Sequence, residues 1–192
     1  MRIPIARAIS IVGHPVVLLL VAALVAASAR GASPNQLWFV GGATVAFGAV
    51  VLGFSWLQVR AGRWSHVDAS VANERKSLNL FLGALCIAGA AATWFATHRV
   101  QMPLALGLSG VLIAIALLLS RWVKVSLHAT FAAFATALLW PFVSALVAGA
   151  AITAAVVWSR LVLGRHVVAD VVVGLALGIA AGALFHYAIA RI

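Results

Sequence analysis

The chain has 192 residues, of which 65% are hydrophobic and 8% are charged, and its net charge is +10. A water-soluble domain needs far more charge on its surface, and a disordered chain needs far less apolar content, so the composition excludes both classes. A single cysteine excludes a disulfide framework. The basic residues are scattered between apolar stretches, a pattern that indicates membrane flanks and no nucleic-acid partner. The sequence therefore predicts an all-α integral membrane protein, a helical bundle of six to seven transmembrane spans forming one domain over residues 1–192.

The candidate spans are the apolar stretches between charged residues, because a helix needs about 20 apolar residues to cross the membrane. The first is expected to be a retained helix rather than a signal peptide, since further spans follow it. The stretch between Lys124 and Arg160 is too long for one crossing and has Pro141 near its middle, which predicts two short helices with a turn between them. One long kinked helix is the alternative. The predicted spans are 11–29, 36–58, 78–97, 103–120, 127–140, 142–159 and 167–190.

The first polar segment in chain order is residues 59–77, the longest hydrophilic stretch. It contains Asp68 and Glu74, two of the three acidic residues in the chain, followed by Arg75 and Lys76. An acidic residue close to lipid is costly and needs a partner. Taken alone, the segment is typical of a solvated loop with positive flanks.

The second polar segment is Lys124-Val-Ser126-Leu-His128, just before the predicted helix 127–140. Ser126 is a good N-cap, and the free N–H groups of the first helical turn form an anion-binding site to which Lys124 adds charge. Taken alone, a capped helix with an interfacial histidine is an equally common explanation.

The third polar segment is Ser159-Arg160-x5-His166-x3-Asp170, between the last two predicted spans. At the start of a helix, His166 and Asp170 share one face, where the carboxylate fixes the imidazole tautomer and stabilises its positive charge. The alternative is that Asp170 caps a helix while Arg160 and Arg165 flank the membrane. That alternative leaves the cost of an acid inside a membrane helix unexplained.

An even number of predicted spans separates these three segments, so they are expected to meet at one membrane face. Arginine, lysine and helix N–H groups bind phosphoryl groups. One histidine beside a carboxylate can act as nucleophile, and a second can protonate the leaving oxygen. Acids and thiols are too few for a metal cage. The residues thus predict metal-independent phosphoryl transfer without a cofactor.

These motifs resemble those of the type-2 phosphatidic acid phosphatase superfamily, membrane lipid phosphatases related to vanadium haloperoxidases. The resemblance extends from about Asp68 to the C-terminus. It implies that His166 forms a phosphohistidine, that Asp170 orients His166, and that His128 protonates the leaving group. It further implies phosphate-binding roles for a set of polar and basic residues: Arg160, Ser126, Arg75 and, as the additional cation, Lys124 or Lys76.

The chain departs from the family pattern at three points. Val125 and Leu127 replace the usual proline and glycine of the second motif, Pro-Ser-Gly-His. Asp68 stands where the first motif has a lysine seven residues before its arginine, here Arg75. Two additional spans, about 78–120, separate the first two motifs, which leaves the substrate class open.

The resemblance implies a membrane phosphatase that acts on a lipid phosphate or diphosphate of isoprenoid or phosphatidate type. A lipid-to-lipid phosphotransferase, a small membrane transporter and a structural membrane protein are the alternatives. Among the other histidines, His14, His98 and His186 are expected to be structural or interfacial. His66, in the segment 59–77, is expected to belong to the loop alone, and an approach to the site is the alternative.

The predicted location is the bacterial inner membrane. Ten of the 13 basic residues fall on the side that carries the motifs, so the positive-inside rule predicts a cytoplasmic site. Five of these ten are candidate phosphate ligands or their neighbours, which weakens the rule here, and many bacterial members of the resembled family act on the periplasmic side.

Overall fold

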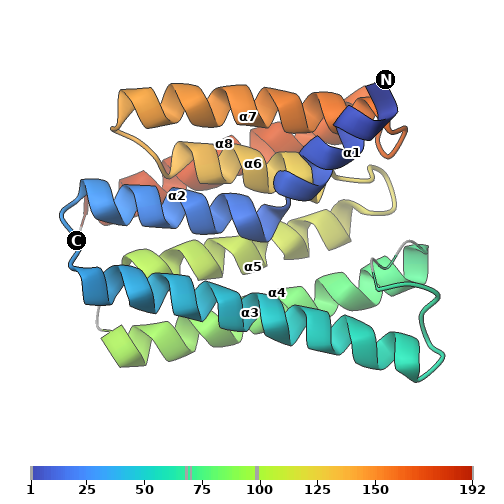
Figure 1. Cartoon of the computed structure of the whole chain (residues 1–192), viewed down its shortest axis with the longest axis horizontal. Helices are drawn as coiled ribbons and strands as arrows, with labels where there is room; N and C mark the ends of the chain where they lie inside the picture. The colour runs from blue at the N-terminus through green and yellow to red at the C-terminus, as the bar shows by residue number, and fades with distance from the viewer. Residues whose placement is uncertain (1, 68, 70, 98–99, 192) are drawn as a thin grey trace. The chain divides into compact units, whose positions relative to one another are not determined.

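The computed structural model describes residues 2–67, 69, 71–97 and 100–191. Within these residues all regular structure is helical, which confirms the predicted all-α class (Figure 1). The helices are α1 (Arg2–Val12), α2 (Pro15–Ala29), α3 (Pro34–Arg60), α4 (Ala72–Thr97), α5 (Gln101–Leu119), α6 (Leu127–Ala137), α7 (Val143–Val162) and α8 (Val168–Ile189). The chain forms two compact units, one of Met1–Gly41 with Leu119–Ile192 and the other of Gly42–Leu118.

Five helices, α3, α4, α5, α7 and α8, are long and apolar enough to cross a membrane. The pair α1 and α2 meets the same criterion only as one span with a bend of 54°, which brings the total to six. Helix α6 has 11 residues, and a helix of that length rises only about 16 Å, too little for the hydrocarbon core. The prediction of a full span at 127–140 is therefore wrong, although a helix does begin there.

The predicted first span, 11–29, is also wrong in its extent. The chain is already helical from Arg2, and the helix breaks at Gly13 and His14 before α2 begins at Pro15. His14 is extended (φ −63°, ψ 137°), as expected for a residue that precedes proline, and its Nδ1 accepts a hydrogen bond from the Val16 N–H at 3.4 Å.

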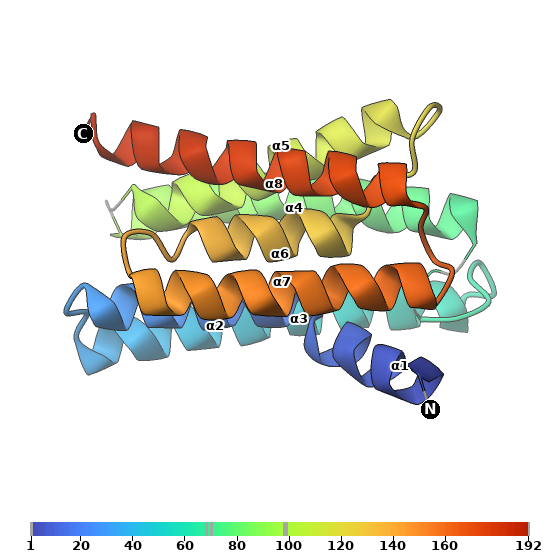
Figure 2. The same cartoon turned by 90° about the horizontal axis from the view of Figure 1, so that it is seen from above.

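Helix α6 is the centre of the first unit, where α2, α7 and α8 all pack against it (Figures 1 and 2). Every residue from 129 to 135 is buried, including Thr130 and Phe134. Glycines in α8 allow this close approach, since a Cβ on Gly178 would overlap the carbonyl oxygen of Thr130. A Cβ on Gly174 would lie 2.9 Å from the carbonyl oxygen of Ser126. Small residues at such a contact bring helix backbones together, and here they place the start of α6 beside the start of α8.

The region around Pro141 turns as predicted. Helix α6 ends at Ala137 and α7 begins at Val143, so the chain forms two packed helices instead of one long kinked helix. A hydrogen bond of 2.9 Å between the hydroxyls of Thr136 and Thr153 joins the two helices near this turn. The turn returns α7 along α6, which brings Arg160 back to the end of the unit where α6 begins.

The second unit contains α4, α5 and most of α3. The segment between α3 and α4 is closed by Glu74, which accepts hydrogen bonds from the N–H and hydroxyl of Ser65 at 2.7 and 3.0 Å and from the Val71 N–H at 3.3 Å. Trp64 is buried edge-on against Phe54. Residues 72–77 belong to α4, so the loop is shorter than predicted.

Candidate active site

His166 lies in the short connection between α7 and α8, and Asp170 lies in the first turn of α8. The Nδ1 atom of His166 is 3.3 Å from Oδ2 of Asp170 and 3.1 Å from the carbonyl oxygen of Lys124. A carbonyl oxygen and a carboxylate oxygen only accept hydrogen bonds, so Nδ1 carries the proton. The Nε2 atom is therefore left with its lone pair, which is the form that a nucleophilic histidine needs.

Two further hydrogen bonds tie the second and third motifs together. The Ser126 N–H donates to the carbonyl oxygen of Asp170 at 3.1 Å. The Lys124 Nζ donates to the carbonyl oxygen of Arg165 at 2.9 Å. Segments about 40 residues apart in the sequence are thus fixed to each other beside His166.

Arg160, in the last turn of α7, is held by one strong hydrogen bond. Its Nη1 donates to Oγ of Ser10 at 2.7 Å. Its Nε and the Oγ of Ser126 are the two buried side-chain polar atoms without a hydrogen-bond partner among the described residues. Leaving such a group unpaired costs about 1–3 kcal/mol, and the cost is relieved where a ligand supplies the missing partner.

His128 lies in the first turn of α6, where burial, and next the positive charge of Arg160, lower its pKa from the usual 6.5 to about 3. Its ring meets the ring of His14 edge-on, with centroids 5.6 Å apart and an interplanar angle of 86°. The predicted phosphate and proton-transfer residues of the second and third motifs thus gather at one end of the first unit.

The electrostatics of the site favour an unprotonated His166. Burial, and next the positive charge of Arg160, lower the pKa of His166 below its usual value of 6.5, while the hydrogen bond to Asp170 opposes them. A histidine with a lowered pKa is neutral at neutral pH, so its Nε2 lone pair is available for attack.

The first-motif residues lie in the other unit. Arg75 and Lys76 are on the first turn of α4, beside the Glu74 contacts described above. Asp68 lies outside the described residues, as does His98. The roles of Arg75 and Lys76 in binding phosphate stay predictions.

Sequence reasoning missed Ser10 and missed the second role of His14. His14 was expected to be structural or interfacial, and it does cap α2, but its ring also contacts His128. The available signal was the Gly13-His14-Pro15 run, which breaks a span and exposes polar groups inside it. Nε2 of His186 donates a hydrogen bond of 2.8 Å to the carbonyl oxygen of Ala137, as expected of a structural histidine.

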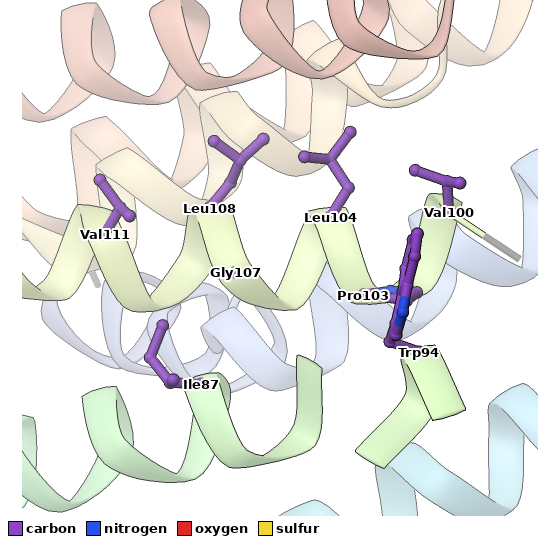
Figure 3. A pocket seen from close by; sticks show the side chains of 8 residues that line it. All are labelled: Ile87, Trp94, Val100, Pro103, Leu104, Gly107, Leu108 and Val111. Carbon is purple, nitrogen blue, oxygen red and sulfur yellow. The ribbon is translucent and has the colours of Figure 1, made fainter. Parts of the chain in front are cut away.

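An open pocket with a volume of about 490 Å³ lies on the second unit (Figure 3). It is lined by apolar residues of α4 and α5, among them Ile87, Trp94, Leu104 and Leu108. None of the candidate site residues lines it. In the described part of the chain, no three His, Cys, Asp or Glu side chains are grouped to hold a metal ion.

The chain matches no protein-family model, no curated protein and no solved structure. Its function is therefore inferred from the motifs and from the geometry that brings two of them together.

Proposed function

We propose that this protein is a membrane phosphatase of the type-2 phosphatidic acid phosphatase kind, acting on a lipid phosphate or diphosphate of isoprenoid or phosphatidate type. One observation carries the proposal: His166 is held at Nδ1 by Asp170 and by the Lys124 carbonyl, which leaves Nε2 as a free nucleophile. The unpaired Nε of Arg160 and Oγ of Ser126 support it, because a phosphoryl group would supply oxygen acceptors for both.

The first step is attack by Nε2 of His166 on phosphorus. The new N–P bond forms as the bond from phosphorus to the leaving oxygen breaks, and His128 donates a proton to that oxygen. Burial, and next the positive charge of Arg160, lower the pKa of His128 to about 3, so His128 becomes a proton donor only when the negative charge of a bound phosphoryl group offsets Arg160 and raises that pKa. Arg160, Ser126 and Lys124 hold the phosphoryl oxygens and offset the charge that accumulates on them. Asp170 stabilises the positive charge that develops on the imidazole of His166.

The second step regenerates the enzyme. His128, now neutral, takes a proton from a water molecule whose oxygen attacks phosphorus. As the new O–P bond forms, the N–P bond breaks and its electron pair returns to Nε2 of His166. Inorganic phosphate then leaves. A lipid substrate fits this site because the helices that carry it are apolar enough to lie in a membrane, where the lipid tail is already dissolved.

The direct test is phosphate release by purified protein in detergent, with a panel of lipid monophosphates and diphosphates. We expect release to persist in excess EDTA, because acids and thiols are too few for a metal cage. Activity that is lost on chelation and restored by Mg²⁺ or Zn²⁺ would contradict the proposal. Vanadate should inhibit, since it adopts the five-coordinate geometry of the transferring phosphoryl group.

Product analysis in the same assay distinguishes hydrolysis from transfer to a second lipid. Inorganic phosphate as the main product supports the phosphatase. Phosphate recovered on an added acceptor lipid, in place of inorganic phosphate, would assign the same chemistry to a phosphotransferase.

We further propose that the protein lies in a bacterial inner membrane with its site on the cytoplasmic side. The reason is the excess of basic residues near the motifs. Arg121 is exposed in the segment that carries Lys124, so a cysteine there reports on this side. In a Cys86→Ala background, Arg121→Cys should resist an impermeant thiol reagent in intact cells and react after permeabilisation. Reaction in intact cells would place the site on the outer side.

A further inference from the structure

The break between α1 and α2 brings two polar side chains to the proposed site from a part of the chain that carries no motif. Ser10 lies in the last turn of α1, and His14 lies in the break itself, directly before α2. Ser10 accepts the hydrogen bond from Arg160, and His14 contacts His128. Each therefore touches one of the two residues to which phosphate binding and proton transfer are proposed.

The bond to Ser10 leaves one edge of the Arg160 guanidinium available. Nη1 is occupied by Oγ of Ser10 at 2.7 Å. Nε and Nη2 form the side-on edge, whose two N–H groups match two oxygens of a phosphoryl group. Nε is buried and has no partner in the described residues. Ser10 thus fixes the guanidinium in the orientation in which Nε has no partner within the described part of the chain and a ligand can accept its hydrogen bond.

His14 is fixed in turn by the helix that it caps. Because the Val16 N–H donates to its Nδ1 at 3.4 Å, that nitrogen holds a lone pair and the neutral ring is protonated at Nε2. The ring then stands edge-on to His128 at 5.6 Å between centroids. This contact limits the rotation of the His128 ring.

The break between α1 and α2 packs against α7. Gly13 lies so close to Val156 that a Cβ would overlap the valine side chain. Val156 is fully buried and lies four residues, about one turn, before Arg160 on the same helix face. Ala6, on α1, is also fully buried. This packing places Ser10 beside Arg160 and makes the position of the break part of the site's geometry.

We propose that Ser10 and His14 are positioning residues of the active site, Ser10 orienting Arg160 toward the phosphoryl group and His14 orienting His128 toward the leaving oxygen. The inference rests on the proposed phosphatase function. It extends the site to the broken helix pair α1–α2, which the motifs do not include.

Ser10 is tested by vanadate and inorganic phosphate binding, which needs no turnover. The variants are Ser10→Ala, Ser10→Thr, which keeps the hydroxyl, and Arg160→Ala. The matched control is Ser28→Ala, since Ser28 is an exposed serine on α2. Ser10→Ala should weaken binding on the order of tenfold, the effect of losing one hydrogen bond to a charged group. Ser10→Thr should restore most of it, and Ser28→Ala should match the wild type.

His14 is tested by the dependence of the rate on the leaving group. His14→Asn keeps an oxygen that can accept the Val16 N–H, so α2 stays capped while the ring contact with His128 is lost. The rate with a lipid phosphate should fall on the order of tenfold. The rate with p-nitrophenyl phosphate should change little, because its leaving group needs little protonation. An equal fall with both substrates, or no fall with either, would contradict a role in orienting His128.

The binding experiment separates this inference from the proposed function. If the wild type binds vanadate, Arg160→Ala does not, and Ser10→Ala binds as the wild type does, the role of Ser10 is wrong while the function stands. If the wild type neither binds vanadate or phosphate nor releases phosphate from any lipid, the proposed function fails and the inference fails with it.

Discussion

Two buried carboxylates lie at equivalent positions in the two units of this protein, Glu74 in the first turn of α4 and Asp170 in the first turn of α8. Each is 7% exposed, and each accepts a hydrogen bond from the backbone N–H three residues earlier, of Val71 at 3.3 Å and of Val167 at 3.2 Å. As helix caps they are the same device. They differ in their remaining partners.

The other carboxylate oxygen of Glu74 accepts hydrogen bonds from the backbone N–H and the hydroxyl of Ser65, and these bonds close the preceding loop. Asp170 instead holds a titratable ring, His166, next to two buried polar atoms that have no partner in the described residues. An acid at the start of a membrane helix therefore does not indicate chemistry by itself. The partner that the acid orients, and the unpaired groups around it, distinguish the candidate active site from a loop clasp.

The largest expected effect is that of His166→Ala, which should abolish turnover for every leaving group because no phosphohistidine can form. The paired variant is His66→Ala, since His66 is an exposed histidine near Glu74, and it should keep its activity. Phosphate release from a lipid phosphate and from p-nitrophenyl phosphate measures both. Full activity in His166→Ala would show that the region around Asp170 is no more an active site than the region around Glu74.

Asp170→Asn and Glu74→Gln should differ in the quantity that they change. Asp170→Asn should lower kcat by about 10³–10⁴-fold while the protein stays folded, because the amide cannot stabilise the charged ring of His166. Glu74→Gln should leave kcat per folded molecule unchanged. Kinetics on detergent-purified protein, with circular dichroism to measure the folded fraction, separate the two effects. A loss of kcat in Glu74→Gln at full helicity would make the two carboxylates alike.

His128→Ala should reduce the rate on the order of 10²–10⁴-fold for a substrate with an alkoxide leaving group. The reduction should be milder for p-nitrophenyl phosphate, whose leaving group needs little protonation. If His166→Ala is rescued by the good leaving group while His128→Ala is inactive on both substrates, the two roles are reversed. Equal and modest losses in both variants would instead favour the transporter alternative.

A smaller effect is expected on stability in the second unit. Glu74→Gln replaces a carboxylate that accepts three hydrogen bonds, two of them from backbone N–H groups, so the melting temperature should fall. Ser65→Ala removes only the hydroxyl donor and should give a smaller fall. Thermal unfolding followed by circular dichroism in detergent makes this comparison. An unchanged melting temperature in both variants would show that the hydrogen bonds of Glu74 to Ser65 and Val71 do not stabilise the unit.

The smallest expected effect is a shift in pH dependence. Because the pKa of His166 is lowered, the acid limb of kcat/KM should lie below the usual histidine value of 6.5. The charge of Lys124 contributes to this lowering. Lys124→Gln should therefore raise the pKa of His166 and move the acid limb to higher pH. A limb that moves to lower pH would contradict the assignment of that limb to His166.

The geometry of the third motif was predictable from local sequence. The spacing of His166 and Asp170 placed them on one helix face, and the structure confirms a contact of 3.3 Å. The turn at Pro141 followed from the properties of proline, and it returns Arg160 toward Ser126. Local rules were sufficient because each of these features depends on residues within a few turns of one another.

Three features were not predictable in this way. The helix that begins at Leu127 is shorter than the span 127–140, because it is buried on all sides against α2, α7 and α8 and need not reach across the membrane. The start of α4 at Ala72 depends on Glu74, whose capping contacts were not recognised in the sequence. The contacts of Ser10 and His14 depend on the packing of Gly13 against Val156, which the hydrophobic periodicity of the sequence does not reveal.

The central claim, that His166 becomes phosphorylated, is tested most directly by trapping the intermediate. His128→Ala should slow attack by water on the phosphohistidine, so this variant is mixed with p-nitrophenyl phosphate and quenched in alkali, in which phosphohistidine is stable. Peptide mass spectrometry should then find one phosphoryl group on His166, and none after the same treatment of His128→Ala combined with His166→Ala. Phosphate on another residue, or turnover with no phosphorylated protein at any time point, would contradict the account.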